Sequence, residues 1–249
     1  MNIILFSQEE IDNPVSAEDI RAHHVINILK LSPGESFDAA VINKGSGKAL
    51  IKNITSKEIT FTFKFSNSNV KRNPVSLLTA VTRPPEAKKI LKNCTSIGIS
   101  TLFLSVLDKS EKSYIDSTLW KNANYKKYLI EGASQAFAAD IPEVKLFQSL
   151  SESLSNITDN YKIRVALDNY EAEGLLGKLE IPELIFSEQE NPEPHTILAV
   201  GGERGWSARE RKMLSDYGFK LYSIGERVLK TETACAAGLS IIFSKMGLM

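Results

Sequence analysis

From Pro74 onward, the chain alternates short apolar runs with longer segments in which apolar residues recur at helical spacing. This alternation is typical of a mainly parallel β-sheet whose strands are connected by helices. We therefore expect residues 73–249 to form an α/β domain. Its expected strands cover residues 75–81, 101–107, 164–167, 196–200 and 220–224, and its expected helices cover residues 86–97, 119–137, 172–179, 208–217 and 232–245.

The segment before Pro74 has a different pattern. A single helix is expected at about residues 17–31, and it ends at the turn-forming Ser32-Pro33-Gly34. The remainder is predicted to form a small β-rich domain over residues 1–72, joined to the α/β domain by a polar linker at residues 67–74. Its expected strands cover residues 2–6, 36–42, 49–54 and 59–65.

Charge and cysteine content exclude several classes of protein. The 249 residues include 30 basic and 30 acidic side chains, so affinity for nucleic acid must come from a local basic patch rather than from net charge. Cys94 and Cys235 are far apart and have no histidine cluster nearby, which argues against a disulfide framework and a metal site. No run approaches the roughly 20 apolar residues of a membrane span, and Gln8, Glu9 and Glu10 interrupt any signal-peptide pattern. We expect a cytoplasmic protein with no membrane segment and no bound metal.

Residues 200–207 carry the strongest local signal, Val-Gly-Gly-Glu-Arg-Gly-Trp-Ser, between a predicted strand and a predicted helix. Ser207 and Glu210 form a capping-box pattern that marks the start of the helix. Glycines at the carboxyl end of a strand let the backbone approach a ligand closely, and open α/β sheets bind ligands at this edge. The alternative is an ordinary tight turn. The segment lacks the Gly-Lys-Ser/Thr of a P-loop and departs from the dinucleotide-binding fingerprint.

A second turn follows the next predicted strand, at residues 223–234, with the sequence Ser-Ile-Gly-Glu-Arg-Val-Leu-Lys-Thr-Glu-Thr-Ala. If the two strands are neighbours, the two loops lie side by side at one edge of the sheet. Considered alone, the second segment is equally consistent with a strand, a loop and a capped helix. The candidate ligand site is therefore the pair of loops.

Together the two segments resemble the carboxyl-terminal signature of the SPOUT methyltransferases, specifically of the family that methylates uridine N3 in small-subunit ribosomal RNA. Weaker matches at residues 24–34, 95–99 and 135–142 extend the resemblance over nearly the full length. The family pattern Ile-Gly-Pro-Glu-Gly-Gly-Phe-Ser is matched at Gly201, Glu203, Gly205 and Ser207, and the pattern Leu-Gly-x-Arg-Ile-Leu-Arg-x-Glu-Thr-Ala at Gly225, Arg227, Leu229, Glu232, Thr233 and Ala234.

This resemblance implies a PUA-like β-barrel RNA-binding domain at residues 1–72 and a methyltransferase domain with a trefoil knot at residues 73–249. It also implies S-adenosylmethionine as the cofactor, small-subunit ribosomal RNA or the assembled small subunit as the substrate, and a homodimer as the working form. Carried over by position, the residues expected to contact the cofactor are Leu167, Val200, Gly201, Gly205, Ile224, Gly225, Val228, Leu229 and Ala234.

Several positions depart from the family pattern. Gly202 stands in place of a proline and Arg204 in place of a glycine, Lys30 and Lys230 replace arginines, and Ala138 replaces another arginine. Because lysine lacks the planar fork with which arginine grips a phosphate, the geometry of RNA binding is expected to differ. Arg204 is either a cation beside the cofactor loop or a solvated loop side chain. The residues predicted to contact RNA are Lys30, Arg83, Lys92 and Gln135.

Methyl transfer to uridine N3 needs alignment of the reactants, removal of the N3 proton and stabilisation of charge on the uracil carbonyl oxygens. Glu203 and Glu232 are the candidate bases, and Arg227 and Lys230 are the candidate cations. Each has a plainer alternative. Glu232 can balance the dipole at the start of a helix, Glu203 can accept hydrogen bonds from loop amides, and the two cations can hold RNA phosphates.

The leading functional expectation is therefore an S-adenosylmethionine-dependent uridine-N3 methyltransferase of small-subunit ribosomal RNA. One alternative is a related knotted methyltransferase with another RNA target. The other is a catalytically silent RNA-binding protein of the same fold.

Overall fold

The computed structural model describes residues 2–68, 70, 73–157, 159–181 and 195–249. The chain divides into two compact units, one formed by Met1–Lys71 with Ala133–Ile141 and the other by Arg72–Gly132 with Pro142–Met249. A segment far along the chain thus packs with the amino-terminal residues. Residues 69, 71 and 72 of the expected linker lie outside the described residues.

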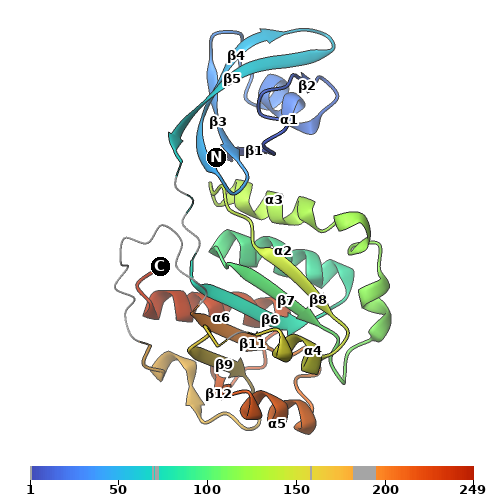
Figure 1. The fold of residues 1–249 in the computed structure, drawn as a ribbon, viewed down its shortest axis with the longest axis vertical. Coiled ribbons are helices and arrows are strands. Elements are labelled where there is room, and N and C mark those ends of the chain that lie inside the picture. The colour runs from blue at the N-terminus through green and yellow to red at the C-terminus, as the bar shows by residue number, and fades with distance from the viewer. Residues whose placement is uncertain (1, 69, 71–72, 158, 182–194) are drawn as a thin grey trace. The chain divides into compact units, whose positions relative to one another are not determined.

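The first unit contains a five-stranded sheet of order β1-β3-β4-β5-β2 (Figure 1). Strands β3, β4 and β5 are antiparallel, and β1 is parallel to β3. Alternate side chains such as Phe37, Ala39 and Ile51 are buried in one apolar core with Phe6, as expected for strands with one solvated face. The strands are β1 (Ile4–Phe6), β2 (Val15–Ser16), β3 (Ser36–Val41), β4 (Gly45–Ile54) and β5 (Glu58–Asn67).

The helix expected at residues 17–31 is wrong in length and type. Helix α1 covers only Ile20–His23, and the chain continues as a π-helical turn, η1 (His24–Ile28). The side chain of Asp19 caps α1 by accepting a 2.8 Å hydrogen bond from the amide of Arg21. Lys30 then has a φ of 55°, a left-handed conformation that no helix continues through.

The second unit contains a seven-stranded, fully parallel sheet of order β10-β12-β9-β11-β6-β7-β8. The expected α/β architecture is therefore confirmed. The strands are β6 (Val75–Ala80), β7 (Thr101–Ser105), β8 (Glu143–Phe147), β9 (Ile163–Leu167), β10 (Gly174–Leu175), β11 (Thr196–Val200) and β12 (Lys220–Ser223). The helices are α2 (Pro84–Ile97), α3 (Lys126–Gln135, whose residues from Ala133 onward belong to the first unit), α4 (Leu150–Ser155), α5 (Ala208–Asp216) and α6 (Thr231–Lys245). Short 3-10 turns are η2 (Lys112–Asp116), η3 (Lys121–Ala123) and η4 (Leu176–Lys178).

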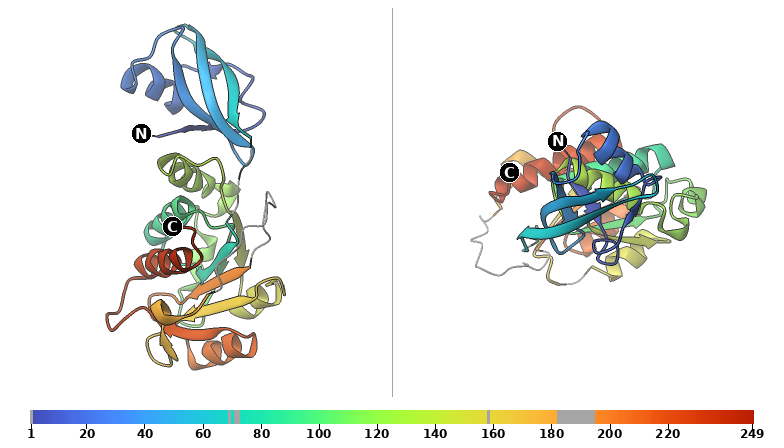
Figure 2. Two further views of the ribbon diagram at one scale, coloured as in Figure 1. Left: turned by 90° about the vertical axis from the view of Figure 1, so that its left-hand side faces the viewer. Right: turned by 90° about the horizontal axis from the view of Figure 1, so that it is seen from above.

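Helices cover both faces of this sheet (Figures 1 and 2). Helix α6 packs on α2, and it approaches the sheet so closely that a Cβ on Gly238 would lie 2.9 Å from the side chain of Leu198. Helices α4 and α5 lie on the opposite face, where Leu154 and Leu214 share a core with Ile197. Because neighbouring strand residues point to opposite faces, the buried strands are apolar on both sides. The carboxyl edge of the sheet carries the loops.

Two of the helices expected in this unit are wrong. Within residues 119–137 only α3 is α-helical, because Asn122 and Ala123 have φ values of 51° and 54° that break the helix. Residues 172–179 contain the short strand β10 and the turn η4, and two glycines, Gly174 and Gly177, weaken a helix there.

Candidate functional site at the carboxyl edge of the parallel sheet

Strands β9, β11 and β12 end at the same level of the sheet. Leu167 of β9 pairs with Val200 of β11 on one side and with Tyr222 of β12 on the other. Because the strands are parallel, the loops that follow them leave from one edge. Strand β9 lies between β11 and β12, so the two predicted loops are not carried by neighbouring strands, although both reach the same cavity.

These loops enclose a cavity of about 80 Å³, which we call the three-loop cavity. Its wall includes every residue predicted to contact a cofactor except Gly225. It also includes Glu203 and Arg227 from the predicted catalytic group. The structure thus brings together residues from three separate strand ends, as ligand sites in open α/β sheets require. The lining residues are Leu167, Asp168, Asn169, Tyr170, Val200, Gly201, Gly202, Glu203, Gly205, Ile224, Arg227, Val228, Leu229, Thr231 and Ala234.

The loop at residues 201–206, which we call the glycine loop, is closed by its own backbone. The amide of Gly205 donates a 2.9 Å hydrogen bond to the carbonyl of Gly202, and Gly205 has a φ of +62°. A Cβ on Gly201 would lie 3.1 Å from the Cα of Gly205, a contact tighter than ordinary packing allows. The glycines are therefore required for the shape of the loop itself, before any ligand is considered.

Buried polar side chains hold the loops after β9 and β11. The carboxylate of Asp168 accepts hydrogen bonds of 2.7 Å from the amides of Tyr170 and Glu171 and one of 2.9 Å from Nε of Arg211. The hydrogen bond from Arg211 to Asp168 raises the pKa of the guanidinium. Asp168 was not predicted as a site residue, although a charged residue directly after a buried strand indicates a position at the edge of the sheet where ligands bind.

The capping box predicted at Ser207 and Glu210 is confirmed, and it has a second role. The Ser207 hydroxyl accepts a bond from the Glu210 amide at 3.1 Å, and Oε2 of Glu210 accepts one from the Ser207 amide at 2.8 Å. The other oxygen, Oε1, accepts a 2.8 Å bond from the amide of Asp108 in the loop after β7. Nearby, Nζ of Lys109 donates to the carbonyls of Arg204 and Trp206 at 3.2 Å and 2.8 Å. The β7 loop and the glycine loop are therefore fixed to one another.

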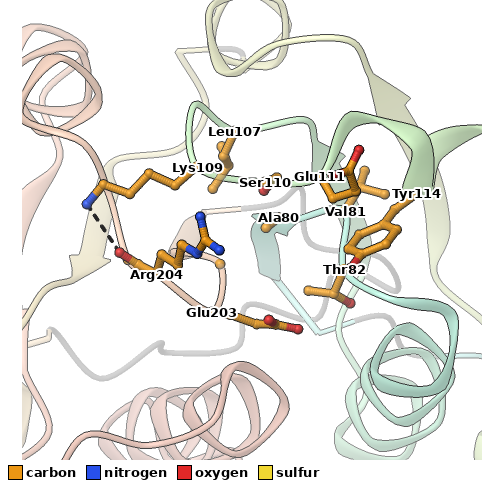
Figure 3. A pocket seen from close by; sticks show the side chains of 12 residues that line it. Ala80, Val81, Thr82, Leu107, Lys109, Ser110, Glu111, Tyr114, Glu203 and Arg204 are labelled. Atoms are coloured by element: carbon orange, nitrogen blue, oxygen red, sulfur yellow. Dashed lines mark hydrogen bonds between the residues drawn. The ribbon is translucent and has the colours of Figure 1, made fainter.

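A second cavity of about 150 Å³ adjoins the glycine loop (Figure 3). We call it the Thr82 cavity. It shares Gly202, Glu203 and Gly205 with the three-loop cavity. None of its residues outside the glycine loop was predicted as a site residue, because they come from the ends of β6 and β7 and from η2. They are Ala80, Val81, Thr82, Leu107, Lys109, Ser110, Glu111 and Tyr114.

Each cavity has a buried threonine hydroxyl in its wall that lacks a hydrogen-bond partner among the described residues. Oγ1 of Thr231 belongs to the wall of the three-loop cavity, and Oγ1 of Thr82 to the wall of the second cavity. Buried polar groups are almost always hydrogen-bonded. Unpartnered hydroxyls in both walls are the pattern expected where a ligand supplies the missing partner.

The remaining two predicted catalytic residues do not line either cavity. Lys230 is exposed at the start of α6. Glu232, with a side chain only 10% exposed, is paired at 3.2 Å with Nζ of Lys89 from α2. Burial alone raises the pKa of Glu232, but hydrogen bonds from its own amide and from Lys89 outweigh it and hold that pKa below the ordinary value. This pairing favours the structural role for Glu232.

The residues predicted to contact RNA are divided between the two units. Lys30 and Gln135 are exposed in the first unit. Arg83 is exposed immediately before α2, and it forms no ion pair among the described residues. Lys92 lies on α2 with its ammonium 3.0 Å from a carboxylate oxygen of Glu131. Of the four, Arg83 is the side chain best placed to reach a phosphate from the second unit.

Two other kinds of site are absent from the described residues. None of the described helices has the length and apolar character needed to cross a bilayer. The same part of the chain holds no group of three or more histidine, cysteine or acidic side chains arranged to bind a metal ion.

Comparison with known proteins identifies the class. Residues 69–243 match the family model described as an RNA methyltransferase domain.

The chain is also similar over its full length to solved structures that share its fold. One, a ribosomal RNA small subunit methyltransferase E from Neisseria gonorrhoeae bound to S-adenosyl methionine, has a TM-score of 0.74, 16% identity and 97% coverage of each chain. Another, a Legionella pneumophila methyltransferase in complex with the same cofactor, has a TM-score of 0.76, 17% identity and 98% coverage of each chain. The protein is a member of the RNA methyltransferases.

Curated relatives identify the family within this class. The chain is 33% identical over 250 residues to ribosomal RNA small subunit methyltransferase E 1 of Borreliella burgdorferi, covering 99% of both chains. It is 31% identical over 252 residues to ribosomal RNA small subunit methyltransferase E of Treponema pallidum, covering 98% of this chain and 91% of the relative. The chain therefore belongs to the ribosomal RNA small subunit methyltransferase E family, and the resemblance drawn from the two loops is confirmed.

Proposed function

We propose that this chain transfers the methyl group of S-adenosylmethionine to N3 of a uridine in small-subunit ribosomal RNA. Its relatives with high coverage are named as small-subunit ribosomal RNA methyltransferases, and two structures of the same fold are described as bound to S-adenosylmethionine. The observation that carries the proposal is the three-loop cavity, in which residues from three strand ends, chosen from the sequence as cofactor contacts, line one wall.

The residues that line the three-loop cavity suit this cofactor. Apolar side chains of Leu167, Ile224 and Leu229 suit the faces of an adenine ring, and the backbone at the strand ends offers hydrogen-bond groups to polar edges. The unpartnered hydroxyl of Thr231 provides one more polar contact. Bound there, S-adenosylmethionine would supply a methyl group on a positively charged sulfur, an electrophile that needs no metal.

Among the candidate bases, the geometry favours Glu203. It is exposed, and it borders both cavities, so its carboxylate can accept the N3 proton of a base held beside the donor. Arg227 also lines the three-loop cavity and can stabilise negative charge that spreads onto the uracil carbonyl oxygens. Glu232 and Lys230 then act at the start of α6, where Glu232 balances the helix dipole.

We extend the proposal to the architecture and the assembly. A trefoil knot in the second unit is supported by the path from β12 at the sheet's far side back to α6, which packs on α2 and beside β6 and β11. A homodimer is supported by Val228 and Tyr170, which line the cavity yet are 80% and 78% exposed. The antiparallel sheet of the first unit suits a PUA-like RNA-binding domain. We propose a cytoplasmic location, where ribosomal RNA is modified.

Two measurements test the proposed function. Calorimetric titration of the purified chain with S-adenosylmethionine should show binding, and its absence favours a silent RNA-binding protein. Mass spectrometry of ribosomal RNA from a strain that lacks the gene should show loss of N3-methyluridine from the small subunit. Loss of a different methylated nucleotide would identify another RNA target and refute the uridine-N3 assignment.

A further inference from the structure

The Thr82 cavity is not used by the cofactor assignment above. It meets the three-loop cavity at Gly202, Glu203 and Gly205. A molecule in one cavity and a molecule in the other would thus both contact these three residues. For a transfer reaction between two molecules, this arrangement places the two reactants against the same wall.

The size of the Thr82 cavity limits what can enter it. Its volume is about 150 Å³, and a cavity of this volume accommodates a single six-membered ring. Its lining is mainly polar and charged, so a ring with hydrogen-bonding edges suits it better than an apolar one.

Three side chains in the wall match the edges and faces of such a ring. Figure 3 shows Arg204 and Glu203 of the glycine loop on one side of the cavity and Tyr114 on the other. A guanidinium can donate to carbonyl oxygens, a carboxylate can accept from a ring N–H, and an aromatic ring can stack on the face of a base. A uracil ring presents two carbonyl oxygens with an N–H between them.

We infer that the Thr82 cavity receives the acceptor pyrimidine, with Arg204 binding a carbonyl oxygen, Glu203 facing the ring N–H and Tyr114 stacking on the ring. This inference rests on the proposed function and deepens it by naming the acceptor residues. The buried hydroxyl of Thr82, which has no partner among the described residues, gives the wall a further polar group.

The reaction moves one proton and one methyl group. The N3 proton passes to the carboxylate of Glu203, and the nitrogen lone pair forms the new bond to the methyl carbon. The bond between that carbon and the donor sulfur breaks, and its electron pair remains on the sulfur, which becomes neutral. Arg204 acts together with Arg227 to offset the negative charge that develops on the carbonyl oxygens while the proton leaves.

The experiment compares Arg204→Gln and Tyr114→Leu with the matched control Arg209→Gln in the full chain. Arg209 is an exposed arginine five positions from Arg204 that pairs with Asp108 and lines neither cavity. Affinity for S-adenosylmethionine is measured by calorimetry, and kcat/KM is measured with small-subunit ribosomal RNA that lacks the modification. Arg204 is exposed, so Arg204→Gln removes the cation without disturbing the core.

Arg204→Gln and Tyr114→Leu should each lower kcat/KM for the RNA by about 10-fold or more while changing the affinity for S-adenosylmethionine by less than about twofold. Arg209→Gln should match the wild type in both. Wild-type kcat/KM in both test variants overturns the inference. Equal loss of cofactor affinity and transfer also overturns it, because it places part of the donor in this cavity.

Different results refute the proposed function and the assignment of the acceptor cavity. A wild-type chain that binds no S-adenosylmethionine, or transfers no methyl group to the RNA, refutes the proposed function together with this inference. If the wild-type chain binds S-adenosylmethionine and transfers the methyl group, and both test variants do so equally well, only the assignment of the acceptor cavity is refuted.

Discussion

The indole nitrogen of Trp206 donates a 2.9 Å hydrogen bond to the carbonyl oxygen of Leu167, so the glycine loop is tied to the end of the strand beside its own. Trp206 is 1% exposed and is the largest fully buried side chain. The bond uses the carbonyl at the end of β9, and both Trp206 and Leu167 are buried. The position of one wall of the three-loop cavity therefore depends in part on this side chain.

Replacing Trp206 with phenylalanine should both destabilise the protein and loosen the cofactor cavity. The buried carbonyl of Leu167 loses its donor, and this alone costs about 1–3 kcal/mol in the free energy of unfolding. The smaller ring also leaves a gap in the core it shares with Leu214. Urea denaturation measures the first effect, and calorimetry with S-adenosylmethionine measures the second. A variant with unchanged cofactor affinity would show that the loop is held by other contacts.

Glutamine substitutions at Glu203 and Glu232 should have opposite signatures. Glu203→Gln keeps the shape but cannot accept the N3 proton, so kcat should fall by about 100-fold or more with stability and cofactor affinity unchanged. Glu232→Gln weakens the pair with Lys89 and should lower the free energy of unfolding with a smaller effect on kcat. Turnover with unmodified ribosomal RNA measures kcat, and urea denaturation measures the free energy of unfolding. A larger loss of kcat in Glu232→Gln would make Glu232 the base.

The sheet could be predicted because its central strands carry their own signal. The runs at β6, β7 and β11 are short and buried on both faces, and those at β9 and β12 are short and buried in part. Strand β8 was missed because it lies at the sheet edge, where Glu143 is exposed and Lys145 partly so, and such a run resembles a loop. Helix α4 was missed because six residues are too few to show helical periodicity.

The two cavities also differ in how much of each could be predicted from the sequence. Most of the three-loop cavity could be predicted because its residues lie within two continuous motifs around Gly201 and Gly225. The Thr82 cavity could not, because Thr82 and Tyr114 lie outside both motifs and meet Arg204 of the glycine loop only through the order of the strands. The link between Asp168 and Arg211 spans 43 positions, and no local pattern encodes it.

The pair between Lys89 and Glu232 should make stability depend on pH in the acid range. The pKa of Glu232 in the folded protein lies below its ordinary value of 4.5, so the ionised carboxylate stabilises the fold above that pH. This contribution is lost as the pH falls through the folded pKa. Lys89→Met removes one of the groups that lower the pKa, so it should cost up to about 1 kcal/mol near pH 7 and progressively less as the pH falls below 4.5.

The check is urea denaturation of the wild type, Lys89→Met and Lys89→Arg across this pH range. Lys89→Arg keeps the positive charge and should behave like the wild type. A difference between wild type and Lys89→Met that is constant with pH would mean that the lysine stabilises the protein through its methylene groups and not through the carboxylate.

Salt dependence of RNA binding should separate Arg83 from Lys92. Arg83 forms no ion pair among the described residues, whereas the ammonium of Lys92 already lies 3.0 Å from Glu131. Each phosphate that a cation neutralises releases counterions, so losing one contact reduces the slope of log affinity against log salt by about 1. Arg83→Ala should show this reduction, with weaker binding at low salt and unchanged affinity for S-adenosylmethionine.

Lys92→Ala should change the slope less, because Glu131 competes with the phosphate. Filter binding of small-subunit ribosomal RNA at several salt concentrations makes the comparison, and equal slopes for Arg83→Ala and the wild type would remove Arg83 from the RNA interface.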